Sequence, residues 1–258
     1  MKIADILAVV EQFAPPCIQE DWDNSGLCIG SPSAECTGVL VGFDCTPALI
    51  DQAVESGCNL VITHHPLIFK GLRKINDESP VGDAIIRAIR GGVAVYAAHT
   101  SADKVIEGVS GAMARRLGLE NIAILEDEGG HGLGAVGDLP RPMDAIQAVA
   151  FVKERFGLKG LRSSTPIKAP IRRIAMCGGS GGSLIDQAMS AGAQLYVSAD
   201  ISYHNFFTRE GFMVMDIGHF ESEVEISSIL FSLLRKNFPT FAVRLDASLR
   251  ESNPVHYF

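Results

Sequence analysis

The sequence predicts an α/β protein made of two similar halves, each with a mostly parallel sheet and helices on both faces. Three observations lead to this expectation. Apolar strand-like runs alternate with helix-like runs, one segment occurs twice, and histidines follow several predicted strands. A chain of 258 residues is long enough for two domains of ordinary size, and 47% apolar with 20% charged residues is typical of a globular protein.

The predicted elements alternate as an α/β fold requires. Residues 3–10 place apolar side chains at three- and four-residue spacing, which is typical of an amphipathic helix, and Pro15 and Pro16 end it. The following segments predict, in order, a strand at 38–43, a helix at 47–56, a strand at 60–63, a helix at 81–90 and a strand at 93–96. This βαβαβ order indicates parallel strands joined by helices.

One helix–turn–strand segment occurs twice. Residues 48–62 align without a gap on residues 183–197, and both copies contain Leu-Ile-Asp-Gln-Ala. An apolar strand precedes each copy, so we infer a structural duplication. The stretch 126–134 is rich in glycine and acidic residues and predicts the boundary between the halves. We therefore expect domains at 1–128 and 129–258.

Charge and cysteine content exclude several classes of protein. The formal net charge of −8 has the wrong sign for binding a phosphate backbone, so nucleic acid is not expected as a partner. No apolar run could span a bilayer, and Asp5 and Glu11 interrupt the apolar core that a signal peptide needs, so we expect no membrane association and a cytoplasmic location. The six cysteines form no CxxC pair and are expected to be buried thiols.

Four of the seven histidines follow predicted strands: His64, His65, His99 and His219. Ligands of parallel sheets bind at the carboxyl ends of the strands. His99 and Asp103 share the pattern His-x3-carboxylate with His219 and Glu223, one pair in each half.

Imidazole and carboxylate together suit Zn, Mn, Fe, Co or Ni, and this set exceeds what one tetrahedral ion requires. We therefore expect two divalent metal ions per chain. Ala199 and Asp200 replace the His-His pair in the second copy, so one composite site at the interface of the halves is the economical interpretation.

Several of these residues have structural alternatives. Asp103 precedes an amphipathic run at 104–117 and could cap a helix. Glu223 lies with Glu221 and Glu225 at the start of the last helix, where the helix dipole favours acidic residues. The glycine-rich segment 178–183 could hold an anion or form a tight turn, and it lacks the lysine of a P-loop. His131, His204 and His256 are expected at the surface or beside the ligands.

Four segments resemble the hallmark motifs of the Nif-three-like dinuclear metal centre proteins, which are labelled GTP cyclohydrolase 1 type 2 homologs. These are Trp22-Asp23-Asn24-Ser25-Gly26-Leu27, the segment 62–70 with its His-His-Pro, His99-Thr100-Ser101-Ala102-Asp103, and Gly218-His219-Phe220-Glu221-Ser222-Glu223. The resemblance covers almost the whole chain. It implies two interlinked domains and a toroidal homo-hexamer with metal sites facing an inner cavity.

The resemblance also implies residue roles. The metal ligands would be His64, His65, Asp103, His219 and Glu223, with Glu223 bridging the two ions. His99 would lie beside the metals as general base or as a group that orients the substrate. Two positions depart from the family pattern, Ser101 where asparagine is common and Ala135 where relatives tend to carry arginine, and the missing arginine weakens a nucleotide assignment.

Two functions therefore compete. One is a metal-dependent hydrolase acting on a small molecule, with ring-opening hydrolysis of GTP as the form that the family label implies. The alternative is a non-enzymatic protein that binds or delivers metal, or regulates a partner. Neither the metal nor the substrate follows from these residues.

Overall fold

The computed structural model describes residues 1–249 and 252–257, and the chain folds as two compact units. Unit 1 comprises residues 1–102 and 226–254, and unit 2 comprises residues 103–225 and 255–258. The units are interlinked because the chain returns to unit 1 after completing most of unit 2. The division differs from the expected halves 1–128 and 129–258, since the glycine-rich stretch 126–134 forms the turn of a hairpin.

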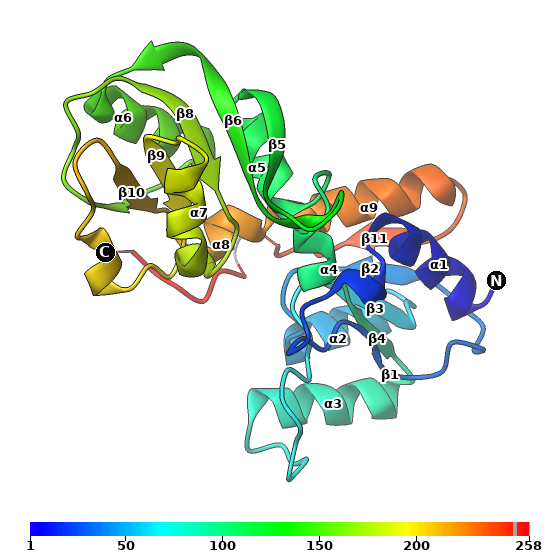
Figure 1. The fold of residues 1–258 in the computed structure, drawn as a ribbon. Helices are drawn as coiled ribbons and strands as arrows, with labels where there is room; N and C mark the ends of the chain where they lie inside the picture. The colour runs from blue at the N-terminus through cyan, green and yellow to red at the C-terminus, as the bar shows by residue number, and fades with distance from the viewer. Residues whose placement is uncertain (250–251, 258) are drawn as a thin grey trace. The chain divides into compact units, whose positions relative to one another are not determined.

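Unit 1 is built on a five-stranded sheet with the order β1-β4-β3-β2-β11 (Figure 1). The strands are β1 (Gly26–Ile29), β2 (Val39–Val41), β3 (Leu60–Thr63), β4 (Ala94–Ala97) and β11 (Val243–Leu245). Four strands are parallel, and only the edge strand β1 pairs antiparallel, with β4. All residues of β2, β3 and β4 are buried, which requires cover on both faces of the sheet.

The helices of unit 1 supply that cover. They are α1 (Ile3–Phe13), α2 (Pro47–Glu55), α3 (Pro80–Gly91) and α9 (Glu225–Asn237), with the short η1 (Pro16–Ile18) and α4 (Thr100–Asp103). Helices α2 and α3 pack together on the face that carries Leu40, Val61 and Val95. Both begin as their sequences dictate, because Thr46 and Ser79 accept the first free backbone N–H groups and a proline follows each.

Unit 2 contains a six-stranded sheet with the order β5-β6-β8-β9-β10-β7. The strands are β5 (Glu120–Asp127), β6 (Gly132–Met143), β7 (Arg162–Ser163), β8 (Ile171–Met176), β9 (Leu195–Ser198) and β10 (Met213–Asp216). Its helices are α5 (Val109–Arg116), α6 (Ala145–Phe156), α7 (Ile185–Ser190) and α8 (His219–Glu223), with η2 (Gly181–Leu184) and η3 (Tyr203–Phe206).

The α/β class and the similarity of the two units are confirmed. In unit 1 Leu60 pairs with Val39, and in unit 2 the aligned Leu195 pairs with Ile174. The expectation of a mostly parallel sheet holds for unit 1 alone. In unit 2 only β8-β9-β10 are parallel, because the β5–β6 hairpin and the short β7 add antiparallel pairs. Among the described residues, no helix has the length and apolar character needed to cross a membrane.

Candidate metal centre

Three histidines of unit 1 gather at the carboxyl ends of two neighbouring parallel strands. His64 and His65 directly follow β3, and His99 follows β4. Because Thr63 pairs with Ala97, the two strand ends lie side by side. The ring centroids of His64 and His65 are 4.9 Å apart, and they lie 5.3 and 5.4 Å from that of His99. One nitrogen from each ring lies within 4.8 Å of the other two, so this group could hold a metal ion.

Hydrogen bonds fix the orientation of the two consecutive histidines. Nδ1 of His64 lies 2.8 Å from the backbone oxygen of Ala98, and Nδ1 of His65 lies 2.7 Å from Oδ1 of Asp44. A carbonyl or carboxylate oxygen only accepts, so Nδ1 must donate in both rings. In a neutral ring the lone pair is then on Nε2, the atom with which such a histidine binds a metal ion.

His99 is held by a buried carboxylate. The side chain of Asp23 is 0% exposed, and its Oδ1 lies 2.7 Å from Nδ1 of His99. Its other oxygen accepts hydrogen bonds from the hydroxyls of Ser25 and Thr100, at 2.8 and 2.5 Å. Burial alone would raise the pKa of Asp23, but the hydrogen bonds from His99, Thr100 and Ser25 outweigh it and hold the pKa well below its ordinary value. Asp23 is therefore ionised, and it holds the His99 ring with Nδ1 donating to its carboxylate, so that Nε2 is the free ring position for chemistry.

Unit 2 contains a second histidine and carboxylate pair. His219 begins α8 directly beyond β10, and its Nε2 lies 2.9 Å from Oε2 of Glu223, one helical turn later. The Glu223 side chain is only 4% exposed. Nδ1 of His219 lies 2.8 Å from Oδ2 of Asp200. Burial opposes ionisation of Asp200, but hydrogen bonds from Ser180 and His219 prevail and lower its pKa.

The structure removes the capping alternative for Asp103. Asp103 is the last residue of α4, and the next helix, α5, begins after Gly108 without a side-chain cap.

The carboxylates of Asp103 and Glu223 both lie near the Cys177 thiol in unit 2. Burial raises the pKa of Cys177, and the negative charges of Asp103 and Glu223 raise it further. Because both charges affect the same buried thiol, Asp103 and Glu223 lie in the same part of unit 2. Glu223 is the last residue of α8, and α9 begins two residues later at Glu225, so the dipole of the last helix stays an alternative reason for an acidic residue here.

The glycine-rich segment 178–183 makes room for Glu223. Gly179 has a φ of +59°, and a Cβ there would collide with the Glu223 carboxylate. Its backbone N–H donates to the Ser222 hydroxyl at 3.0 Å. The segment is therefore a tight turn packed against α8. This geometry favours the turn interpretation over an anion site.

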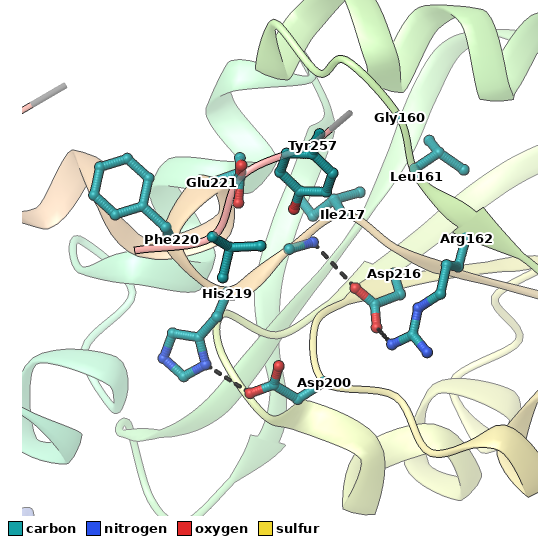
Figure 2. Close-up of a pocket in the computed structure, with 12 residues that line it drawn as sticks. Gly160, Leu161, Arg162, Asp200, Asp216, Ile217, His219, Phe220, Glu221 and Tyr257 are labelled. Carbon is teal, nitrogen blue, oxygen red and sulfur yellow. Dashed lines mark hydrogen bonds and ion pairs between the residues drawn. The ribbon is translucent and has the colours of Figure 1, made fainter. Parts of the chain in front are cut away.

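A pocket of about 400 Å³ adjoins His219 in unit 2 (Figure 2). Its polar wall includes the ion pair of Arg162 with Asp216, and Asp216 also accepts from the Gly218 backbone N–H at 3.1 Å. Tyr257, from the C-terminal segment, contributes another part of the wall. His219 therefore borders a cavity of small-molecule size in unit 2.

Sequence reasoning identified the histidines but missed the carboxylates that orient them: Asp23, Asp44 and Asp200. Asp23 was present in a recognised motif, but its role depends on a contact with a residue far along the chain. The remaining histidines play no part in these groups. His131 lies 3.7 Å from Glu128 near the hairpin turn, and the His204 ring packs with Tyr203 and Phe207. His256 is exposed.

The donor set fits divalent transition metals. Imidazoles held at Nδ1 by oxygen acceptors, together with the buried Glu223 and the half-buried Asp103, suit Zn, Mn, Fe, Co or Ni, and the described groups contain no thiolate. His64 and His65 belong to unit 1, and Asp103, His219 and Glu223 belong to unit 2. The assignment of all five as ligands stays a prediction, as does their union in one site.

Similar proteins are found in several bacteria. A Clostridium acetobutylicum protein named GTP cyclohydrolase 1 type 2 homolog is 34% identical over 229 residues, covering 86% of this chain and 85% of its own. A Lactococcus lactis protein with the same name is 33% identical over 261 residues and covers 99% of both chains. The crystal structure of a Staphylococcus aureus hypothetical protein superposes with a TM-score of 0.93 at 28% identity, covering 100% of this chain and 99% of that one.

A Bacillus cereus protein related to NIF3 shares the fold, with a TM-score of 0.91 at 22% identity and coverage of 100% and 99% of the two chains. The model of the Duf34/NIF3 (NGG1p interacting factor 3) family matches residues 1–254. The histidine motifs, the two-unit α/β fold and this match lead to one conclusion: the chain belongs to the NIF3 family.

Proposed function

We propose that this protein binds two divalent metal ions and uses them to hydrolyse a small molecule. The proposed ligands are His64, His65, Asp103, His219 and Glu223. His99 is proposed as the general base, and Asp23 as the residue that positions it.

The main observation behind the proposal is that the four strand-end histidines make the same kind of contact at Nδ1. Each has its Nδ1 within 2.8 Å of an oxygen acceptor, and three of the four acceptors are carboxylates. Metal-binding histidines characteristically donate their second ring N–H to such an oxygen, which fixes the ring and raises its basicity. Four histidines prepared in the same way support a role in metal binding or proton transfer better than a role in packing.

When bound, a pair of divalent ions supplies Lewis-acid activation of water and of the bond to be hydrolysed. The protein's own contribution to proton transfer lies in His99 and Asp23. His99 accepts the proton of the attacking water at Nε2, and the ionised Asp23 stabilises the imidazolium through Nδ1. His99 can then return the proton to the leaving group. Asp23 stays ionised throughout, because three hydrogen bonds hold its pKa low.

The name shared by the relatives makes GTP the first substrate to test. Metal-loaded protein should be assayed with GTP and with a panel of esters, amides and phosphoesters, with the His99→Gln variant as a control that retains the predicted ligands. Turnover by the wild-type protein that His99→Gln abolishes supports the proposal. Protein that holds its metal but acts on none of these compounds would instead favour metal binding, delivery or regulation. The homo-hexamer is likewise a proposal, which native mass spectrometry tests.

A further inference from the structure

Trp22 and Phe69 form an exposed aromatic pair in unit 1 beside His99. Their side chains are 59% and 43% exposed, and their ring centroids are 5.8 Å apart at an interplanar angle of 64°. The centroid of His99 lies 6.1 Å from that of Trp22 and 6.0 Å from that of Phe69. The exposed fractions show that aromatic surface of both rings remains open to solvent.

Neighbouring residues hold this pair in place without burying it. Asn24 donates from Nδ2 to the backbone oxygen of Ile68 at 2.5 Å, and this contact joins the segment that carries Trp22 to the segment that carries Phe69. Asp23, next to Trp22, is anchored on His99 at 2.7 Å. The backbone on each side of the pair is therefore fixed, and the rings themselves remain available. Preorganised, exposed aromatic surface of this kind is typical of a binding site.

The charge around the pair indicates what the ligand would carry. Lys70 directly follows Phe69, and Arg73 and Lys74 lie further along the same segment, before the acidic residues Asp77 and Glu78. All three cations are exposed. A ligand with an anionic group would gain from the exposed Lys70 beside Phe69, whereas a neutral ring would gain from stacking alone.

We propose that Trp22 and Phe69 form a stacking platform for a planar aromatic ring that carries an anionic group. The platform adjoins His99, so the ligand would be the small-molecule substrate of the proposed hydrolase, and this last step rests on the proposed function. The stacking itself requires only the residues of unit 1.

The chain contains one tryptophan, so its fluorescence reports on the platform directly. Three probes separate the contributions: a purine nucleoside monophosphate, the nucleoside without phosphate, and ribose 5-phosphate without the ring. We expect saturable quenching by the monophosphate, weaker binding of the nucleoside, and no quenching by ribose 5-phosphate. Phe69→Ala should weaken binding of the monophosphate by roughly 5- to 100-fold, the range for loss of one stacked contact.

Matched variants identify the parts of the platform. Phe69→Tyr keeps a ring and should keep the affinity. Phe207→Ala removes a 74% exposed aromatic side chain from unit 2 and should change nothing. Lys70→Gln should bring the affinity for the monophosphate closer to that for the nucleoside. Circular dichroism of each variant confirms that it is folded.

Two results would overturn the platform: no quenching by either ring-bearing probe, or equal quenching by ribose 5-phosphate. Titrations of metal-free and metal-loaded protein keep its failure separate from failure of the proposed function. Ring-dependent quenching in a protein without hydrolytic activity leaves the platform standing and removes the hydrolase. Hydrolysis of non-aromatic compounds without any ring-dependent quenching removes the platform and leaves the hydrolase.

Discussion

Oδ2 of Asp200 lies 2.8 Å from Nδ1 of His219, and this contact explains how the second copy of the repeat differs from the first. Asp200 aligns with His65, a predicted ligand in unit 1. In unit 2 the same strand-end position therefore carries a carboxylate that orients a predicted ligand. The same position thus contributes a predicted ligand in unit 1 and an orienting carboxylate in unit 2.

The orienting carboxylates should control metal affinity. We expect Asp44→Ala and Asp200→Ala each to lower the affinity for divalent metal by about 10- to 100-fold, because the ring of His65 or His219 loses its fixed tautomer. Competition against a chromogenic chelator measures the change. Asp51→Ala is the control, because Asp51 pairs only with a surface arginine, Arg87, among the contacts described for it. Unchanged affinity in the first two variants would refute this role.

Replacing Asp23 should separate catalysis from metal binding. Asp23→Asn removes the charge that stabilises a protonated His99, so the turnover number for whichever substrate the screen identifies should fall by about 10²- to 10⁴-fold. Metal content should stay at the wild-type level, because neither residue belongs to the predicted ligand set. Wild-type turnover in this variant would refute the role of Asp23 in positioning and stabilising His99.

Asp23 also predicts the direction of acid sensitivity. Its pKa is lower in the folded protein than the ordinary aspartate value of about 3.9, so its ionised form stabilises the fold at neutral pH. This contribution is complete above pH ~4 and is lost as the pH falls below that value. Urea unfolding at a series of pH values should show the loss in the wild type and a flatter profile in Asp23→Asn. Identical profiles would contradict it.

Gly179 should be intolerant of a side chain. Gly179→Ala places a Cβ against the Glu223 carboxylate in a left-handed backbone conformation, which by itself costs about 1–2 kcal/mol. We expect a lower melting temperature and reduced metal binding. Gly71→Ala is the control, because a Cβ at Gly71 meets no atom within 4 Å. Equal behaviour of the two variants would show that the close approach to Glu223 is unimportant.

The cysteines should differ sharply in reactivity. The expectation of buried thiols holds for Cys36, Cys58 and Cys177 but is wrong for Cys17, which is exposed. Burial raises the pKa of Cys36 to about 11, so little thiolate forms there at neutral pH. Titration with a thiol reagent should show a fast phase that Cys17→Ser removes. A fast phase that survives this substitution would contradict the assignment.

Local pattern predicted the parts of the fold that depend on nearby residues. The strand at 60–63 and the helix at 47–56 were found almost at their observed bounds, because apolar runs and caps act over a few residues. The strand-end histidines followed from this placement. The division into units could not be predicted in this way. Helix α9 and strand β11 come from the end of the chain but pack in unit 1, and no local sequence pattern indicates this long-range pairing.

The orienting carboxylates were beyond sequence reasoning for the same reason. Asp23 and His99 are far apart along the chain, and only the antiparallel pairing of β1 with β4 brings their segments together. The stretch 126–134 was expected to be the boundary between the halves, but β5 and β6 pair across it as a hairpin. Composition could not distinguish the two, because a glycine-rich acidic turn has the same composition as a linker.

Metal content per chain tests the central claim most directly. Protein purified without chelator or nickel affinity resin should contain about two transition-metal ions per chain by mass spectrometry, as a two-metal site requires. The double variant His65→Ala with Glu223→Ala should lose them, and His131→Ala should keep them. Wild-type protein that holds no metal and cannot be reloaded with metal would show that these histidines have a structural role. That result would contradict both the metal site and the proposed hydrolase.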